Sequence, residues 1–314
     1  MLDRVTIDQL RSLIAVADTG SFSAAARSLS RVQSAVSQSV SALESALGTT
    51  LFDRSTKVPQ LNDAGRVILE DARHLVRGVE TLKERAASIA AEIEPELTLA
   101  ADPVFPGEVL LNALRDFAKE FPQVPVTLFT EALGAPEQRL LDGAVRLALL
   151  SPYPSMSPEI ETEFLVSVPI VPVAAPSHPL AAIDGPIDAA ALEASVQLVL
   201  TDRTPLTSGI SGGVVSSRIW RFADQATRLD YLLAGFGWCN MPIQTVRDHI
   251  RDGRLRQLAL KTSGPRALPV HVAHRRGRPP GKAGLWLIDE LRASAVRCVG
   301  AGMAYGEHEP IVVA

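Results

Sequence analysis

The segment from residue 63 to residue 94 constrains the fold most strongly, because it contains no proline and can form one long helix. Its apolar residues are separated alternately by three and four positions, the heptad spacing that aligns them in one row along a helix. This row, here called the seam, consists of Ala72, Leu75, Val79, Leu82, Ala86 and Ile89 and continues to Ile93. A helix of this length spans roughly 45 Å. The spacing favours pairing of two chains along the seam; packing of the helix on its own domain is the alternative.

Two shorter helices are predicted ahead of the long one. Ser21 is a suitable N-cap for the first, and Gly48 is a suitable C-cap for the second. Each has one apolar side, formed by Phe22, Ala25, Ala26 and Leu29 in the first and by Val36, Val40, Leu43 and Leu47 in the second. The other side of the second helix is polar and almost uncharged, with Gln33, Ser34, Ser37, Gln38, Ser41 and Ser45.

A short polar helix face of this kind can enter the major groove of DNA, where Gln suits adenine and Ser suits several bases. The two helices are therefore interpreted as a helix-turn-helix with the second as reader; a Ser-rich, solvated helix of an ordinary bundle is the alternative. Residues 51–54 and 58–61 then predict a small hairpin, or wing, with cations at its tip. The predicted DNA contacts are Arg31, Gln33, Ser34, Ser37, Gln38 and Ser41, with Arg54 and Lys57 on the wing.

The order and spacing of these residues resemble the N-terminal domain of LysR-type transcriptional regulators. The matching residues are Gly20 to Ser23, Ala25, Ala26, Leu29, Gln33 to Ser37, Leu43, Glu44, Leu47, Gly48, Leu51 to Arg54, and Leu61 to Gly65. Val32 stands where the family usually has Ser or Thr, so the reader helix is expected to lack a hydroxyl N-cap. Asn62 replaces the usual Thr, and it caps a helix equally well.

The charge of the chain is unusual for a nucleic-acid binder. The net charge is −4 over 314 residues, a length that indicates two or three domains. Between residues 20 and 60, only four cations stand against Glu44 and Asp53. DNA affinity is therefore expected to depend on dimerisation and on helix N-termini as well as on Lys and Arg.

Other functional classes lack support in the sequence. Cys239 and Cys298 have neither metal-ligand nor redox spacing, the six histidines are scattered, and none of the common catalytic motifs occurs. We therefore expect no enzyme activity, no cofactor and no metal. The N-terminus does not resemble a signal peptide, and the longest apolar stretches are too short to span a membrane, so a cytoplasmic location is expected.

Beyond Pro95 the sequence alternates between strand and helix patterns. A first set of alternating elements has predicted strands at 97–101, 125–130 and 145–150 and helices at 109–121 and 136–143. A second set begins with the strand 168–173, the helix 188–193 and the strand 197–201 and continues through segments 218–234 and 246–252. The strand 268–273 and the helix 284–299 close the chain. Such alternation indicates an α/β domain with a parallel sheet covered by helices.

This part resembles the effector-binding domain of the same family, which has the fold of a type II periplasmic binding protein. The matching signals are Phe121-Pro122, Gly143, Leu147 to Leu149, Ser177 to Leu180, Ala234 to Trp238, Met241-Pro242 and Gly253 to Leu255; Arg146 replaces the usual acidic residue. The resemblance implies two subdomains that are joined by crossing strands near residues 162–170 and 266–272, with a ligand in the cleft between them.

The predicted division follows from these patterns. A winged helix-turn-helix domain occupies residues 1–62, a linker and dimerisation helix 63–94, an effector-binding domain 95–304 and a tail 305–314. Within the third part, subdomain I takes about residues 95–165 and 270–304, and subdomain II about 166–269.

Ligands of open α/β sheets bind at the carboxyl ends of the strands. This rule places eight candidate effector-binding residues around the cleft: Asp102, Val104, Phe105, Thr130, Ser151, Thr201, Asp202 and Trp238. Many family members bind carboxylates with Ser or Thr in the first loop, where this chain has Asp102 and Phe105, so a ligand of aromatic or amphipathic character is favoured. Ordinary turn chemistry and core packing are the alternative.

The sequence thus predicts a homodimeric or homotetrameric transcription regulator whose partners are double-stranded DNA, a small-molecule effector and further copies of itself. The effector would act by binding two subunit arrangements with different affinity. A ligand-independent DNA-binding regulator and a solute-binding module without DNA binding are the alternative functions.

Overall fold

The structure is a computed structural model that describes residues 5–53, 59–90, 92–152, 156–207, 213–261 and 266–300. The chain forms two compact units, Met1–Ala90 and Ala91–Ala314. No helix in the described ranges has both the length and the apolar character needed to cross a membrane.

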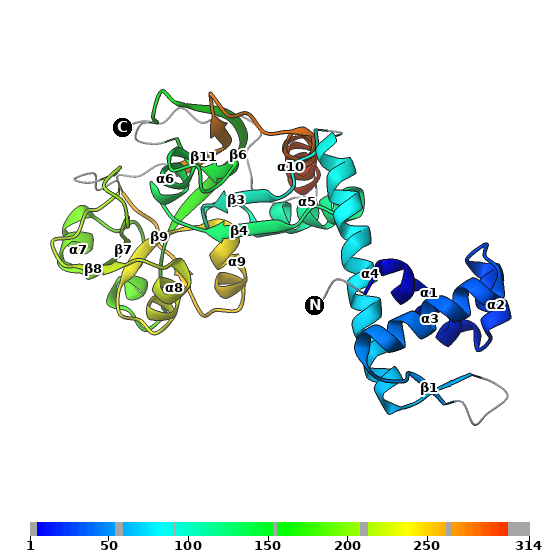
Figure 1. Ribbon diagram of the computed structural model, residues 1–314. Coiled ribbons are helices and arrows are strands. Elements are labelled where there is room, and N and C mark those ends of the chain that lie inside the picture. The colour runs from blue at the N-terminus through cyan, green and yellow to red at the C-terminus, as the bar shows by residue number, and fades with distance from the viewer. Residues whose placement is uncertain are drawn as a thin grey trace. The chain divides into compact units, whose positions relative to one another are not determined.

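The first unit is a three-helix domain followed by a short hairpin and the long helix (Figure 1). Its elements are α1 (Ile7–Thr19), α2 (Phe22–Ser28), α3 (Gln33–Leu47), β1 (Phe52–Asp53), β2 (Gln60–Leu61) and α4 (Asp63–Ala90). The apolar sides predicted for α2 and α3 meet in one core with α1, where Leu13, Ala25, Val36 and Leu43 are buried. The strand pair β1–β2 is antiparallel and forms the base of the predicted wing.

The predicted helix ends are confirmed. Ser21 Oγ accepts a hydrogen bond from the backbone N–H of Ala24, and Gly48 closes α3 in the left-handed conformation with φ of 70°. Val32 precedes α3 without a side-chain cap, as expected. Asn62 Oδ1 accepts the N–H of Gly65 at 2.8 Å and so caps the start of α4.

The second unit is an α/β domain around a nine-stranded sheet. Subdomain I, as predicted above, contains β3 (Leu97–Ala101), α5 (Gly107–Glu120), β4 (Val126–Thr130), α6 (Ala135–Leu141), β5 (Leu147–Leu150) and α10 (Lys282–Gly300). Subdomain II contains the 3₁₀ helix η1 (Pro179–Ala182), α7 (Ala189–Ala194), β7 (Gln197–Leu200), β8 (Ile219–Phe222), α8 (Gln225–Leu233), β9 (Trp238–Pro242), α9 (Ile243–Arg251) and β10 (Arg256–Gln257). Two long strands, β6 (Ile160–Ala174) and β11 (Arg266–Arg275), run through both.

Successive residues of the short strands point to opposite faces of the sheet, and helices pack on both faces. Leu97, Leu99 and Leu147 pack in one core against α5 and α10, which lie side by side (Figure 1). Ala100 and Ala148 point to the other face and pack with Leu140 of α6. This arrangement is possible because successive strand residues face opposite sides of the sheet.

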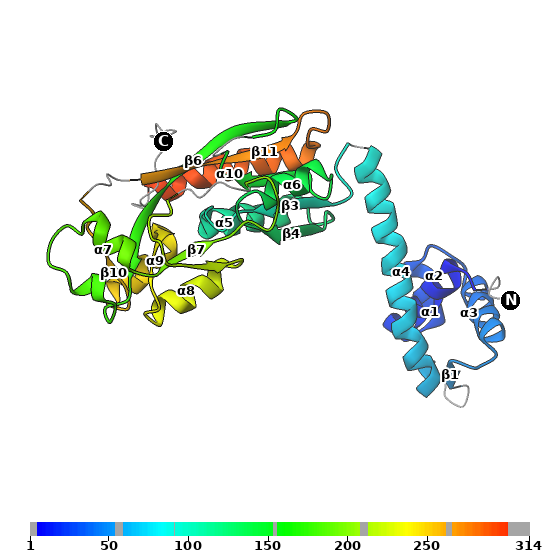
Figure 2. The same cartoon turned by 90° about the vertical axis from the view of Figure 1, so that its left-hand side faces the viewer.

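The sheet is mixed rather than purely parallel, which corrects the predicted sheet type. Strands β3, β4 and β5 are parallel to one another, as are β7, β8 and β9, but β6 and β11 are antiparallel. These two strands lie side by side in Figure 2. Their pairing extends from Arg266 opposite Ile170 to Arg275 opposite Ile160, with a register shift between Val270 and His271. Because the chain leaves subdomain I on β6 and returns on β11, these crossing strands have to run in opposite directions.

Strands β8 and β9 were not predicted separately. The sequence of β9, Trp238 to Pro242, contains Asn and Pro, which are depleted in strands, and it follows Gly237. The strand forms nevertheless, because Val171, Val173 and their neighbours in β6 supply its hydrogen-bonding partners.

Candidate DNA-reading face and effector cleft

The predicted reader face of α3 is exposed along its length. Val36, Val40 and Leu43 are buried in the core of the first unit, so the helix can present only its other side. That side carries Gln33, Ser34, Ser37, Gln38 and Ser41, all exposed. The structure therefore brings five of the predicted DNA-binding residues together on one uncharged polar surface.

Contacts from neighbouring elements fix two residues at the edge of this face. Ser23 Oγ lies 2.8 Å from Gln33 Oε1. Arg31 Nη1 lies 2.6 Å from Asp8 Oδ2, and this hydrogen bond holds the pKa of the Asp8 carboxyl below its usual value. The charge of Arg31 is thus partly compensated. Arg54 and Lys57 lie outside the described residues.

A buried carboxylate at the back of α3 was missed by the sequence reasoning. Glu44 Oε1 accepts the backbone N–H of Leu51 at 2.6 Å and that of Phe52 at 3.4 Å. These two hydrogen bonds attach the start of the wing to the reader helix. The available signal was that Glu44 is the one acidic residue of an otherwise uncharged helix sequence, Gln33–Leu47.

The seam on α4 is only partly available to another chain. Leu75 and Leu82 are 56% and 66% exposed, although both are large apolar side chains. Ala72 is 1% exposed and packs in the core of its own unit, so its assignment to the seam is corrected: the first turns of α4 serve the domain. Val79 is half-buried, Ala86 is exposed, and the side chain of Ile89 lies outside what the structure describes.

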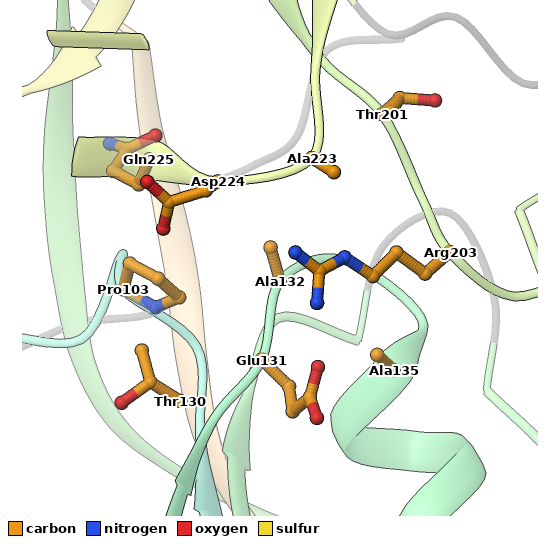
Figure 3. Close-up of a pocket in the computed structure, with 10 residues that line it drawn as sticks. All are labelled: Pro103, Thr130, Glu131, Ala132, Ala135, Thr201, Arg203, Ala223, Asp224 and Gln225. Carbon is orange, nitrogen blue, oxygen red and sulfur yellow. The ribbon is translucent and has the colours of Figure 1, made fainter. Parts of the chain in front are cut away.

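A pocket opens where the carboxyl ends of the strands of the two subdomains meet (Figure 3). Its volume is about 40 Å³. It is lined by Pro103, Thr130, Glu131, Ala132, Ala135, Thr201, Arg203, Ala223, Asp224 and Gln225. Thr130 and Thr201, two of the predicted effector-binding residues, therefore line the same space from opposite subdomains.

Asp102 and Asp202 hold the turn that precedes α6 from both sides of the cleft. The N–H of Leu133 donates to Asp102 Oδ2 at 2.9 Å, and the N–H of Gly134 donates to Asp202 Oδ2 at 3.0 Å. Burial raises the pKa of Asp102 to about 6, against the opposing hydrogen bonds from Val104 and Leu133. Desolvation would also raise the pKa of Asp202, but hydrogen bonds from Thr207, Thr204 and Gly134 outweigh it and lower that pKa.

The two predicted aromatic contacts are wrong. Phe105 is buried in the core beneath α5 and α10. Trp238 is buried as well, packs with Ala174 and Leu192, and donates from Nε1 to Ser216 Oγ at 3.2 Å. It stands at the first residue of β9, which is parallel to β7, and therefore at the end of the strand away from the crevice. Large aromatic side chains gain most by complete burial, and both residues serve the core.

Val104 and Ser151 are not among the residues that line the pocket. The side chain of Val104 is buried, and its backbone carbonyl accepts a hydrogen bond from Gln244 Nε2 of subdomain II at 2.8 Å. Ser151 Oγ is buried and has no hydrogen-bond partner among the described residues.

Arg203 lies in the loop from Thr201 to Thr204 that the sequence places at the cleft, whereas Arg228, Gln225 and Gln244 of subdomain II are cleft residues that the sequence analysis did not identify. Arg228 is 7% exposed, and its Nη2 donates to Gln225 Oε1 at 2.8 Å. A buried arginine leaves no signature in a pattern of apolar spacing. In the described ranges, no group of three or more His, Cys, Asp or Glu residues could hold a metal ion.

Comparison with known proteins agrees with both units. Residues 7–66 match the family described as bacterial regulatory helix-turn-helix protein, lysR family, and residues 90–296 match the LysR substrate binding domain. The regulator AceR of Acinetobacter baumannii is 28% identical over 291 residues, which cover 91% of this chain and 96% of that protein.

Solved structures of full-length regulators share the fold. A mutant of Corynebacterium glutamicum OxyR is 23% identical with a TM-score of 0.58, covering 95% of this chain and 97% of that one. LysG of the same organism, solved with bound effector Arg, is 23% identical with a TM-score of 0.50, covering 93% and 99%.

The chain therefore belongs to the LysR family of transcriptional regulators. Like its relatives, it combines a DNA-binding helix-turn-helix with an effector-binding domain, and the family is not enzymatic.

Proposed function

We propose that this chain is a cytoplasmic homo-oligomer that reads a pseudo-palindromic DNA site with α3 and responds to a small molecule held in the cleft of its second unit. The observation that carries the DNA assignment is the exposed face from Gln33 to Ser41, which is polar and uncharged and lies opposite the buried Val36, Val40 and Leu43. Uncharged side chains of this kind add little to phosphate attraction and are suited to hydrogen bonding with base edges.

Self-association is supported by the exposed part of the seam. Leu75 and Leu82 are seven residues apart and so recur on one side of α4. Pairing through them would bury apolar side chains and present two copies of α3 to half-sites about one helical turn, or a multiple of it, apart.

Control by a ligand is supported by the contacts that span the cleft. Gly134 bonds to Asp202, and Gln244 bonds to the carbonyl of Val104, so the separation of the subdomains determines whether these bonds form. A ligand that binds one separation more tightly than another shifts their populations.

The proposal is tested with purified protein in two steps. In vitro selection from random duplexes, followed by binding at two salt concentrations, should yield a two-fold-related site whose affinity falls with salt. A set of selected sequences without a common site would contradict the readout by α3. The selected duplex is then used to ask whether the small-molecule fraction of a bacterial extract changes DNA affinity.

A ligand-independent regulator is the second candidate, and the small cavity favours it. The volume of about 40 Å³ lies far below the roughly 300–1,000 Å³ of typical ligand pockets. In that case the extract would leave DNA affinity unchanged, and widening the cleft by mutation would have no effect on DNA binding.

A further inference from the structure

Val32 is the most exposed large apolar side chain among the described residues, at 67%. It stands directly before the reader helix, at the N-cap position of α3, with extended backbone angles φ of −84° and ψ of 147°. Val36, one turn further along, is buried in the core of the first unit, whereas Val32 lies outside that core. Single exposed apolar residues are common on protein surfaces, so the position of this one is what matters.

The side chain of Val32 does not stabilise the start of α3. An N-cap residue normally accepts an N–H of the first turn through a side-chain oxygen, and valine is among the least favourable residues there. Val32 forms no such bond, and only its backbone carbonyl takes part, accepting the N–H of Ala35 at 3.1 Å. A hydroxyl would cap the helix, and burial of the isopropyl group would stabilise the core. Val32 does neither, which points to a contact outside the chain.

The residues on both sides of Val32 are held by contacts from other elements. Arg31 Nη1 donates to Asp8 Oδ2 of α1 at 2.6 Å. Ser23 Oγ of α2 donates to Gln33 Oε1 at 2.8 Å. The isopropyl group therefore stands at a fixed position, between an ion-paired arginine and an anchored glutamine.

The major groove of DNA offers one apolar feature that such a group can contact. All base edges present hydrogen-bond donors or acceptors, and thymine alone adds a methyl group, at C5. The first residues of a reader helix are the ones that reach the base edges. Thymine O4, an acceptor for the NH₂ group of Gln33, is bonded to the ring atom next to the one that carries the methyl group. Val32 and Gln33 are thus suited to neighbouring groups of the same groove edge.

We propose that Val32 determines specificity: its isopropyl group packs on the C5-methyl group of one thymine in each half-site, at or next to the base pair that Gln33 reads. This inference rests on the proposed function of α3 as the reader helix. The contact removes from water two apolar groups that are exposed in the free protein and in free DNA. It distinguishes T·A from the other base pairs without a hydrogen bond.

Replacement of single thymines by deoxyuridine tests the contact, because it removes the C5-methyl group and keeps every hydrogen-bonding group of the base. The duplex obtained by in vitro selection is resynthesised with one deoxyuridine at a time and titrated with the full-length protein. At one thymine of the half-site, the wild type is expected to bind the deoxyuridine duplex about fourfold more weakly. A half-site without thymine, or one in which no deoxyuridine weakens binding, would overturn the proposal.

Variants identify the residue that makes the contact. Val32→Ala removes both γ-methyl groups and should bind the thymine and deoxyuridine duplexes equally, whereas Val32→Ile keeps a branched apolar side chain and should keep the preference. Val67→Ala is the matched control, because Val67 is a valine of α4 that is 63% exposed, and it should keep the fourfold ratio. A ratio that survives in Val32→Ala would assign the methyl contact to another residue and overturn the proposal. Val32 is exposed, so its replacement does not endanger folding.

The results also separate this inference from the proposed function. If selection yields a site that Gln33→Ala alters, but Val32→Ala and the wild type have the same ratio of thymine to deoxyuridine affinity, α3 reads the site and Val32 does not contribute. If selection yields no common site, the assignment of α3 as the reader helix fails, and the inference fails with it.

Discussion

The hydroxyl of Ser23, in α2, donates a hydrogen bond to Gln33 Oε1, at the first position of the reader helix α3, over 2.8 Å. The bond occupies one acceptor site of the amide and leaves its NH₂ group to donate. In the major groove, guanine O6 and N7 and thymine O4 are acceptors. Ser23 thus favours these atoms as targets of Gln33 over the two-bond contact with adenine that glutamine alone would favour.

Replacement of Ser23 by alanine is expected to relax preference at the base pair read by Gln33, by about 1 kcal/mol, because the amide becomes free to rotate. Affinity for random DNA should not change. In vitro selection of duplexes with Ser23→Ala, Gln33→Ala and the double variant measures the base preference. Ser23→Thr keeps the hydroxyl and should therefore retain the preference of the wild type. If Gln33→Ala changed the preference and Ser23→Ala did not, Ser23 would have no positioning role.

Leu82→Glu should separate dimers into monomers, because it places a carboxylate in an exposed apolar seam. Sedimentation equilibrium measures the change. Val67→Glu is the matched control, since Val67 is an equally exposed apolar residue of α4 outside the seam. Dimers that survive Leu82→Glu, or that are lost equally in the control, would count against pairing through the seam.

Glu44→Ala should lower the free energy of unfolding by about 1–3 kcal/mol, because it leaves the buried N–H groups of Leu51 and Phe52 without their acceptor. It should also weaken DNA binding through displacement of the wing. Urea unfolding and a binding titration report the two effects. Ser45→Ala, at the exposed neighbouring position, is expected to change stability by less than about 0.5 kcal/mol. Equal stability of the two variants would refute the structural role of Glu44.

Gly134→Ala should force the subdomains apart. An added Cβ would lie 2.6 Å from Asp202 Oδ2 and 2.8 Å from Thr204 Oγ1, so the bond between Gly134 and Asp202 would be lost, with a cost of about 1–3 kcal/mol. Small-angle scattering and urea unfolding measure the opening and the cost. Gly107→Ala, where a Cβ meets nothing within 4 Å, is the control. A variant as compact and stable as wild type would contradict the cross-cleft contact.

The raised pKa of Asp102 should make the free energy of unfolding decrease as the pH rises from about 4 to 6. Its pKa of about 6 lies above the unfolded value near 3.9, so the folded state binds more protons between these values. The free energy of unfolding therefore decreases from about pH 4 to pH 6, by at most roughly 2–3 kcal/mol, and this contribution is constant above that range. Asp102→Asn should remove this part of the slope in urea unfolding at pH 4.5 and 7. An unchanged slope in the variant would exclude Asp102 as its source.

Local patterns predicted the DNA-binding unit well, because its decisive features repeat at helical spacing. The apolar positions of α3 fix which side is buried, so Gln33, Ser34, Ser37, Gln38 and Ser41 have to face outward. The caps at Ser21 and Gly48 depend only on neighbouring backbone groups. The alternation of strand and helix patterns along the chain is likewise a local feature, and it indicated the α/β class of the second unit.

The sequence by itself determined the class of protein, the outward face of α3 and the course of the crossing strands. Only the tertiary structure decided which side chains of a given type serve the core and which serve a site. Ala72 packs in the core of its own unit, whereas Leu82 on the same helix is exposed. Phe105 and Trp238 are buried in the core of the second unit, and the buried Arg228 bonds to the pocket residue Gln225. The physical reason is that spacing fixes the direction of a side chain relative to its own element, whereas burial and charge compensation depend on elements far away in the sequence.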